Sequence, residues 1–154
     1  MKRLSFVVAL TAVALGLAGC QSTPEPPDAD AVSSWMQEQS ASDRPDSLAT
    51  MAGAPTIASS SPSAEDAEGI AVDFASAVNV TAVEFSCFGE ERMSVSVEVR
   101  GAAETRSTGA DDLVCADSPH LLTHALEDAL RVDATSTSEY GLGAWSVVVL
   151  GDEQ

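Results

Sequence analysis

The sequence predicts an all-β fold, a small antiparallel β-sandwich, in its C-terminal part. Apolar and polar residues alternate with a period of two from about residue 82 onward, which is typical of half-buried antiparallel strands. Glycines interrupt these runs at Gly89, Gly101, Gly109 and Gly141. The pattern fits roughly six to eight short strands into under about ninety residues, and small sandwiches reach this density.

The N-terminal residues 1–19 have the pattern of an export signal. Lys2 and Arg3 precede an apolar stretch and then several small residues. The apolar stretch is too short to cross a bilayer comfortably as a helix. We therefore expect a signal peptide that is removed from the mature protein.

This segment ends in Leu17-Ala18-Gly19-Cys20, which resembles the lipobox of bacterial lipoproteins. The resemblance implies that Cys20 is acylated and becomes the first residue of the mature chain. Two or three acyl chains hold a protein firmly, because each buried methylene contributes about 0.8 kcal/mol. We therefore expect the protein on the extracytoplasmic face of the cell membrane, with the membrane as its partner through the lipid on Cys20.

Residues 20–67 are predicted to form a largely disordered linker, acidic and rich in serine and proline. A coil of some forty-odd residues has a root-mean-square span of roughly 35 to 40 Å. Such a linker would lift the folded part clear of the lipid headgroups.

One part of this linker, residues 31–39, is predicted to form a short helix capped by Asp30. Four residues at helical spacing define its less polar side, namely Val32, Trp35, Met36 and Gln39. Two alternatives remain for Trp35. It docks on the folded domain, which we favour because exposing its ring to water is unfavourable, or it serves as an anchor for a partner.

The folded domain is predicted to span residues 68–154. Strands are expected over residues 82–87, 93–100, 130–135 and 145–149, with additional ones over 70–74 and 105–114. The alternation places these side chains on the inner faces: Val83, Phe85, Cys87, Met93, Val95, Val97, Val99, Leu130, Val132, Ala134, Trp145, Val147 and Val149.

Residues 118–130 fit two structures. Ser118 and Pro119 are good residues for a helix start, and Leu122 and Leu126 would share a helix face. The same residues fit an irregular strand from His120 to Ala125, a turn at Glu127-Asp128, and then the next strand. The local residues favour the helix, whereas the regular strands around the segment favour the strand, because a helix leading into Leu130 would leave a gap in the antiparallel sheet.

Cys87 and Cys115 remain once Cys20 is acylated. Two cysteines in an exported domain, each near a strand end, predict a disulfide bond. The alternative is a redox or metal pair, which the absence of a Cys-x-x-Cys spacing disfavours.

His120 and His124, four residues apart, would share a helix face and could bind zinc together. We favour surface histidines instead, and we expect no metal, no catalytic residue and no cofactor. Trp145 is a candidate for a ligand surface, although a tryptophan on the same face as Val147 belongs more often to the core.

The charge balance disfavours nucleic acid and anionic lipid headgroups as partners. The chain has 7 cations and 24 acids, so after removal of Lys2 and Arg3 its formal net charge is about −19. Such a chain is repelled by nucleic acid and by anionic headgroups. Lysine is absent after residue 2, while alanine, aspartate, valine and serine dominate, a bias typical of high-GC genomes.

Residues 83–151 resemble a type of small actinobacterial lipoprotein with a C-terminal β-sandwich domain. The resemblance rests on Phe85–Gly89, Val95–Arg100, Val114–Cys115 with Pro119–His120, and Ala144–Val149. It implies an extracellular β-sandwich, and we therefore favour the strand over the helix for residues 118–130. It brings no catalytic residues to this chain.

Two functions are therefore expected. The first is a membrane-anchored, non-enzymatic lipoprotein that acts as a binding or structural module of the cell envelope, with an envelope protein as a candidate partner. The alternative is a small metal-dependent envelope enzyme that uses His120 and His124. We favour the first, because the sequence offers no convergent acid, base and nucleophile.

Overall fold

The computed structural model describes residues 24–41, 44–60 and 69–154. The predicted signal peptide and Cys20 lie outside these ranges. The elements are α1 (Ala29–Ser40), β1 (Ser47–Gly53), β2 (Thr56–Ile57), η1 (Ala58–Ser60), β3 (Ile70–Phe88), β4 (Arg92–Gly101), β5 (Thr105–Val114), η2 (Cys115–Asp117), β6 (His120–Ser138) and β7 (Ala144–Glu153), where η denotes a 3-10 helix.

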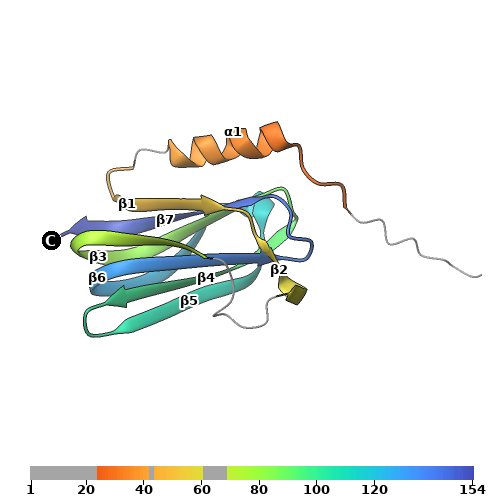
Figure 1. The fold of residues 1–154 in the computed structure, drawn as a ribbon. Coiled ribbons are helices and arrows are strands. Elements are labelled where there is room, and N and C mark those ends of the chain that lie inside the picture. The colour runs from red at the N-terminus through yellow and green to blue at the C-terminus, as the bar shows by residue number, and fades with distance from the viewer. Residues whose placement is uncertain (1–23, 42–43, 61–68) are drawn as a thin grey trace, which may run out of the picture.

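The strands form one sheet in the order β1-β7-β3-β6-β4-β5, antiparallel except that β2 pairs in parallel with β6. The long strands β3 and β6 belong to both halves of this sheet. The second half of β3 pairs with β7, whereas the second half of β6 pairs with β4. The sheet therefore folds over into two layers, with β1 and β7 above β4 and β5 in Figure 1. The predicted antiparallel sandwich is confirmed.

The core lies between the two layers and follows the predicted alternation on three strands. These side chains are buried: Val83, Phe85 and Cys87 of β3; Met93, Val95, Val97 and Val99 of β4; and Trp145, Val147 and Val149 of β7. The prediction was wrong for Leu130, which is 40% exposed. Asp128 has a positive φ of 57°, and the pairing of β4 with β6 shifts beside Ala129. This irregularity buries Ala129 and turns Leu130 outward.

The predicted helix is present as α1, and it packs against β1 and β7 (Figure 1). The four residues of the predicted face are the partly buried ones of this helix. The cap prediction was wrong by two residues. Asp28 is the N-cap, and its Oδ1 accepts hydrogen bonds from the amides of Asp30 at 2.9 Å and Ala31 at 3.0 Å.

Trp35 of α1 docks on the folded domain, as favoured from the sequence. Its ring stacks on that of Phe88, with centroids 5.8 Å apart and an interplanar angle of 19°. The helix also covers the outer face of β7, where Ser146 and Val148 are buried although the alternation turns them away from the core.

The expected linker over residues 20–67 was wrong where the structure describes it. β1 pairs with β7 along its length, and Met51 is 2% exposed, so the sheet begins well before residue 68. The register shifts between Ser47 and Ala49. This shift breaks the period of two by which a strand is recognised in a sequence.

Residues 120–138 form the strand β6, which confirms the favoured reading and excludes the helix. His120 pairs with Phe85 and Leu122 with Val83, so the segment completes the edge of the upper layer. Ser118, expected at a helix start, instead accepts a hydrogen bond from the Cys87 amide at 3.1 Å through its hydroxyl.

Candidate functional site

A disulfide bond joins Cys87, near the end of β3, to Cys115 in η2, with the two Cα atoms 4.9 Å apart. This pairing was predicted and is confirmed. Both cysteines are buried, and the Cys115 amide donates to the Glu91 carbonyl at 2.9 Å. The bond thus fixes the segment after β5 against the turn between β3 and β4.

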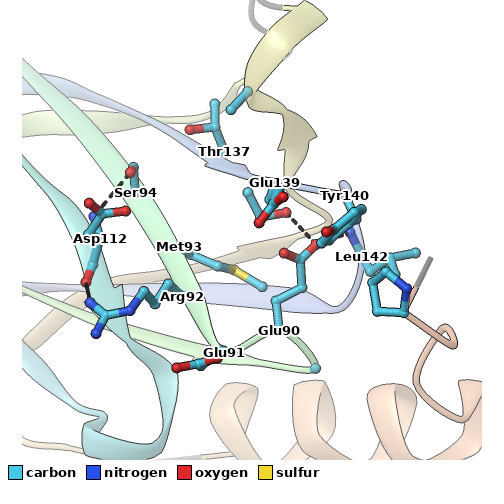
Figure 2. Close-up of a pocket in the computed structure, with 14 residues that line it drawn as sticks. Glu90, Glu91, Arg92, Met93, Ser94, Asp112, Thr137, Glu139, Tyr140 and Leu142 are labelled. Carbon is cyan, nitrogen blue, oxygen red and sulfur yellow. Dashed lines mark hydrogen bonds between the residues drawn. The ribbon is translucent and has the colours of Figure 1, made fainter. Parts of the chain in front are cut away.

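A cavity of about 540 Å³ lies beside this turn and is the candidate binding site. It forms where the β3–β4 turn, the β6–β7 connection and η1 meet (Figure 2). Its charged lining is mainly acidic: four carboxylates, of Glu90, Glu91, Asp112 and Glu139, stand against one cation, Arg92, and Tyr140 lies at the rim. These carboxylates favour a cationic group over an anionic one.

Glu90 connects the two loops that border the cavity. Its Oε1 accepts hydrogen bonds from the Ser138 hydroxyl and the Leu142 amide, both at 2.7 Å. The Ser138 Oγ in turn accepts a hydrogen bond from the Gly141 amide at 3.0 Å. Glu90 therefore holds the β6–β7 connection in place, and its carboxylate is engaged in the structure rather than free for chemistry.

Tyr140 lies at the rim of the cavity and is 41% exposed. A hydrogen bond to Glu139 raises the pKa of its phenol above the ordinary value, and the negative charges of Glu139 and Glu90 add to the effect. Both causes stabilise the protonated phenol over the phenolate.

On the opposite wall, Arg92 donates to the Asp112 carbonyl at 2.8 Å, and the Asp112 amide donates to the Ser94 hydroxyl at 3.3 Å. Asp112 has a positive φ of 55° beside a register shift between β4 and β5. The bulge thus turns this end of β5 toward the cavity.

His120 and His124, the two histidines considered for zinc, both lie in the strand β6 and not in a helix. Residues four apart in a strand are about 13 Å apart, too far for one ion to bind both. His120 Nε2 lies 2.9 Å from the Val114 carbonyl, and the side chain of His124 lies outside the described part. Within that part, no three His, Cys, Asp or Glu side chains are arranged to hold a metal ion.

Trp145, a candidate ligand surface for which a core position was more expected, offers no ligand surface. Its side chain is 1% exposed and its Nε1 donates to the Ala54 carbonyl at 3.0 Å, so it belongs to the core. No sequence motif marks the residues that line the cavity.

Comparisons with models of protein families, with curated proteins and with solved structures found no match to this chain. In the described ranges, no helix combines the length and the apolar character needed to cross a bilayer.

Proposed function

We propose that this protein is an extracytoplasmic lipoprotein, anchored to the cell membrane through Cys20, whose sandwich domain is a non-enzymatic binding or structural module of the cell envelope. The observation that carries the proposal is the disulfide bond between Cys87 and Cys115. Disulfide bonds persist in oxidising compartments outside the cytoplasm. This agrees with the export signal and the lipobox that precede the domain.

The cavity beside Glu90 supports a binding role over catalysis. The Ser138 hydroxyl lies in the lining of the cavity and donates a hydrogen bond to Glu90. Glu90 also accepts a hydrogen bond from the Leu142 amide, so it is not a free general base that could activate this hydroxyl as a nucleophile. A ligand or envelope protein that presents a cationic group fits the carboxylates around the cavity. Nucleic acid is disfavoured by the formal charge of −17 on the whole chain.

The substitution Cys20→Ser tests the anchor. We expect the variant to leave the membrane fraction, whereas Ser22→Ala, a matched change two residues away, should remain there. A Cys20→Ser protein that keeps its membrane fractionation and its detergent extraction would contradict the proposal. A near-stoichiometric transition metal in the purified protein would contradict its non-enzymatic part.

A further inference from the structure

The N-terminal part of the described chain enters the sandwich at one defined end. Pro24 lines the cavity, and a Cβ added to Gly89 would lie 2.9 Å from Cγ of Pro27. We call this the proximal end, made of residues 57–60, 89–91 and 139–143. Figure 1 shows the chain before α1 on this side, opposite the C-terminus.

The other end, which we call the distal end, contains the β4–β5 hairpin and the C-terminus. The Gln154 side chain donates to Asp128 at 3.0 Å, and a Cβ added to Gly101 would lie 3.0 Å from the Asp128 carbonyl oxygen. A ten-residue strand such as β4, which runs between the two ends, is about 30 Å long.

The covalent distance to the predicted anchor is short. Four residue steps separate Cys20 from Pro24, and an extended chain of that length spans at most about 14 Å. If Cys20 carries the lipid, the proximal end cannot move farther than this from the interface. The distal end can then lie about 30 Å higher.

The proximal end also carries apolar side chains suited to an interface. In the described part, the exposed large hydrophobic residues are Ile57, Leu121, Leu130 and Tyr140. Ile57 and Tyr140 are both proximal, and a Cβ added to Gly141 would lie 2.7 Å from Cγ1 of Ile57. Tyrosine suits the boundary between water and lipid, because its ring is apolar and its hydroxyl is polar.

We propose that the proximal end rests on the lipid headgroups, with Tyr140 and Ile57 in contact with the bilayer surface, an inference that rests on the lipid anchor proposed above. The partner is a zwitterionic bilayer, because Glu90, Glu91 and Glu139 at this end repel anionic headgroups. The sandwich then stands on the membrane with its cavity near the headgroups and its β4–β5 hairpin pointing away.

The test uses the full-length lipidated protein on vesicles. With Cys20 acylated and Cys87 bonded to Cys115, the chain's three cysteines leave no free thiol, so one introduced cysteine is a unique labelling site. Ala58→Cys at the proximal end and Ala103→Cys at the distal end, both exposed alanines, form a matched pair. Each variant is labelled with a fluorophore at the introduced cysteine and is bound to phosphatidylcholine vesicles. Some of the lipid headgroups carry a nitroxide, which quenches the fluorescence of a nearby fluorophore.

We expect quenching at position 58 to exceed that at position 103 by at least about threefold, because the ends differ in height by about 30 Å. Equal quenching, or stronger quenching at 103, in a protein that still floats with the vesicles overturns this inference and leaves the anchor standing. A protein that does not float contradicts the anchor itself, and the inference falls with it.

A double variant, Ile57→Ser with Tyr140→Ser, separates contact from tethering. It should still float and should keep its melting temperature, while quenching at position 58 falls by at least about half as the apolar contact is lost. Unchanged quenching would contradict the contact. Replacing phosphatidylcholine with phosphatidylglycerol should also reduce the quenching, and an equal signal on both lipids would overturn the assignment to zwitterionic lipid.

Discussion

Trp35 in α1 and Phe88 at the end of β3 stack with ring centroids 5.8 Å apart, although they lie far apart in the sequence. The contact places α1 on the sandwich beside β1 and β7. It also shortens the free N-terminal chain, because a helix held on the sheet cannot act as a spacer between membrane and domain. From α1 onward, the described residues of the expected linker, 29–41 and 44–60, are therefore part of the folded unit.

We expect Trp35→Ala to lower the free energy of unfolding by roughly 1 to 3 kcal/mol, less than a fully buried tryptophan would lose, because Trp35 is only partly buried. Denaturant unfolding of the soluble Cys20→Ser protein measures it. Gln37→Ala, on the exposed face of the same helix, is the control. Equal stability of the two variants, or a protease-resistant fragment that begins near Gly69, would show that the helix is not docked.

Regular alternation in the sequence predicted the core well, and irregular strands were predicted poorly. Val95, Val97 and Val99 face inward as expected because β4 keeps a period of two through its centre. Leu130 was misplaced because the irregularity at Asp128, where a turn was expected, changes the face on which the following side chains lie, and the alternation of Leu130, Val132 and Ala134 did not show this change. Such bulges depend on partners that the strand meets only in the folded sheet.

The candidate site was harder to predict for a similar reason. Glu90 lies in the β3–β4 turn, whereas Ser138 ends β6 and Leu142 lies in the β6–β7 connection, and only the fold brings these distant segments together. The disulfide bond could be predicted from the sequence, because only one pairing of cysteines is possible once Cys20 is assigned to the lipid. The sequence places no comparable limit on which turns meet to form a cavity.

Removing the disulfide bond should cost about 3 to 4 kcal/mol, because the bond closes a loop with a sequence separation of 28 residues. For a domain of this size the melting temperature should fall on the order of 10 °C. Thermal unfolding of the wild type with and without reductant, beside the Cys87→Ala and Cys115→Ala double variant, measures the effect. A free thiol found at either position in the oxidised protein by peptide mapping would contradict the assignment.

Glu90→Ala should destabilise the domain by about 1 to 3 kcal/mol, because it removes two hydrogen bonds and leaves the Leu142 amide without its acceptor. Glu90→Gln retains a carbonyl oxygen at the same place and should lose less. Glu91→Ala is the matched control, since that side chain is exposed and its change should stay within about 0.5 kcal/mol. Similar unfolding free energies for the Glu90→Ala and Glu91→Ala variants would refute this role of Glu90.

Tyr140 is the sole tyrosine of the chain, so its ionisation can be followed by the ultraviolet absorbance of the phenolate. Its pKa should lie above the ordinary value, because the hydrogen bond to Glu139 and the charges of Glu139 and Glu90 oppose loss of the proton. Glu139→Gln removes the nearer charge, so the pKa should shift down toward the ordinary value. An unchanged titration curve in this variant would exclude Glu139 as the cause.

The account depends most on the chemical state of Cys20, and mass spectrometry of the mature protein tests it directly. We expect the N-terminal peptide to begin at Cys20 and to carry a mass increment that matches a diacylglyceryl group on Sγ. The increment should be present in protein from the membrane fraction and absent from the corresponding peptide of the Cys20→Ser variant. A mature chain that begins elsewhere, or that contains Cys20 without lipid, would contradict both the anchor and the orientation derived from it.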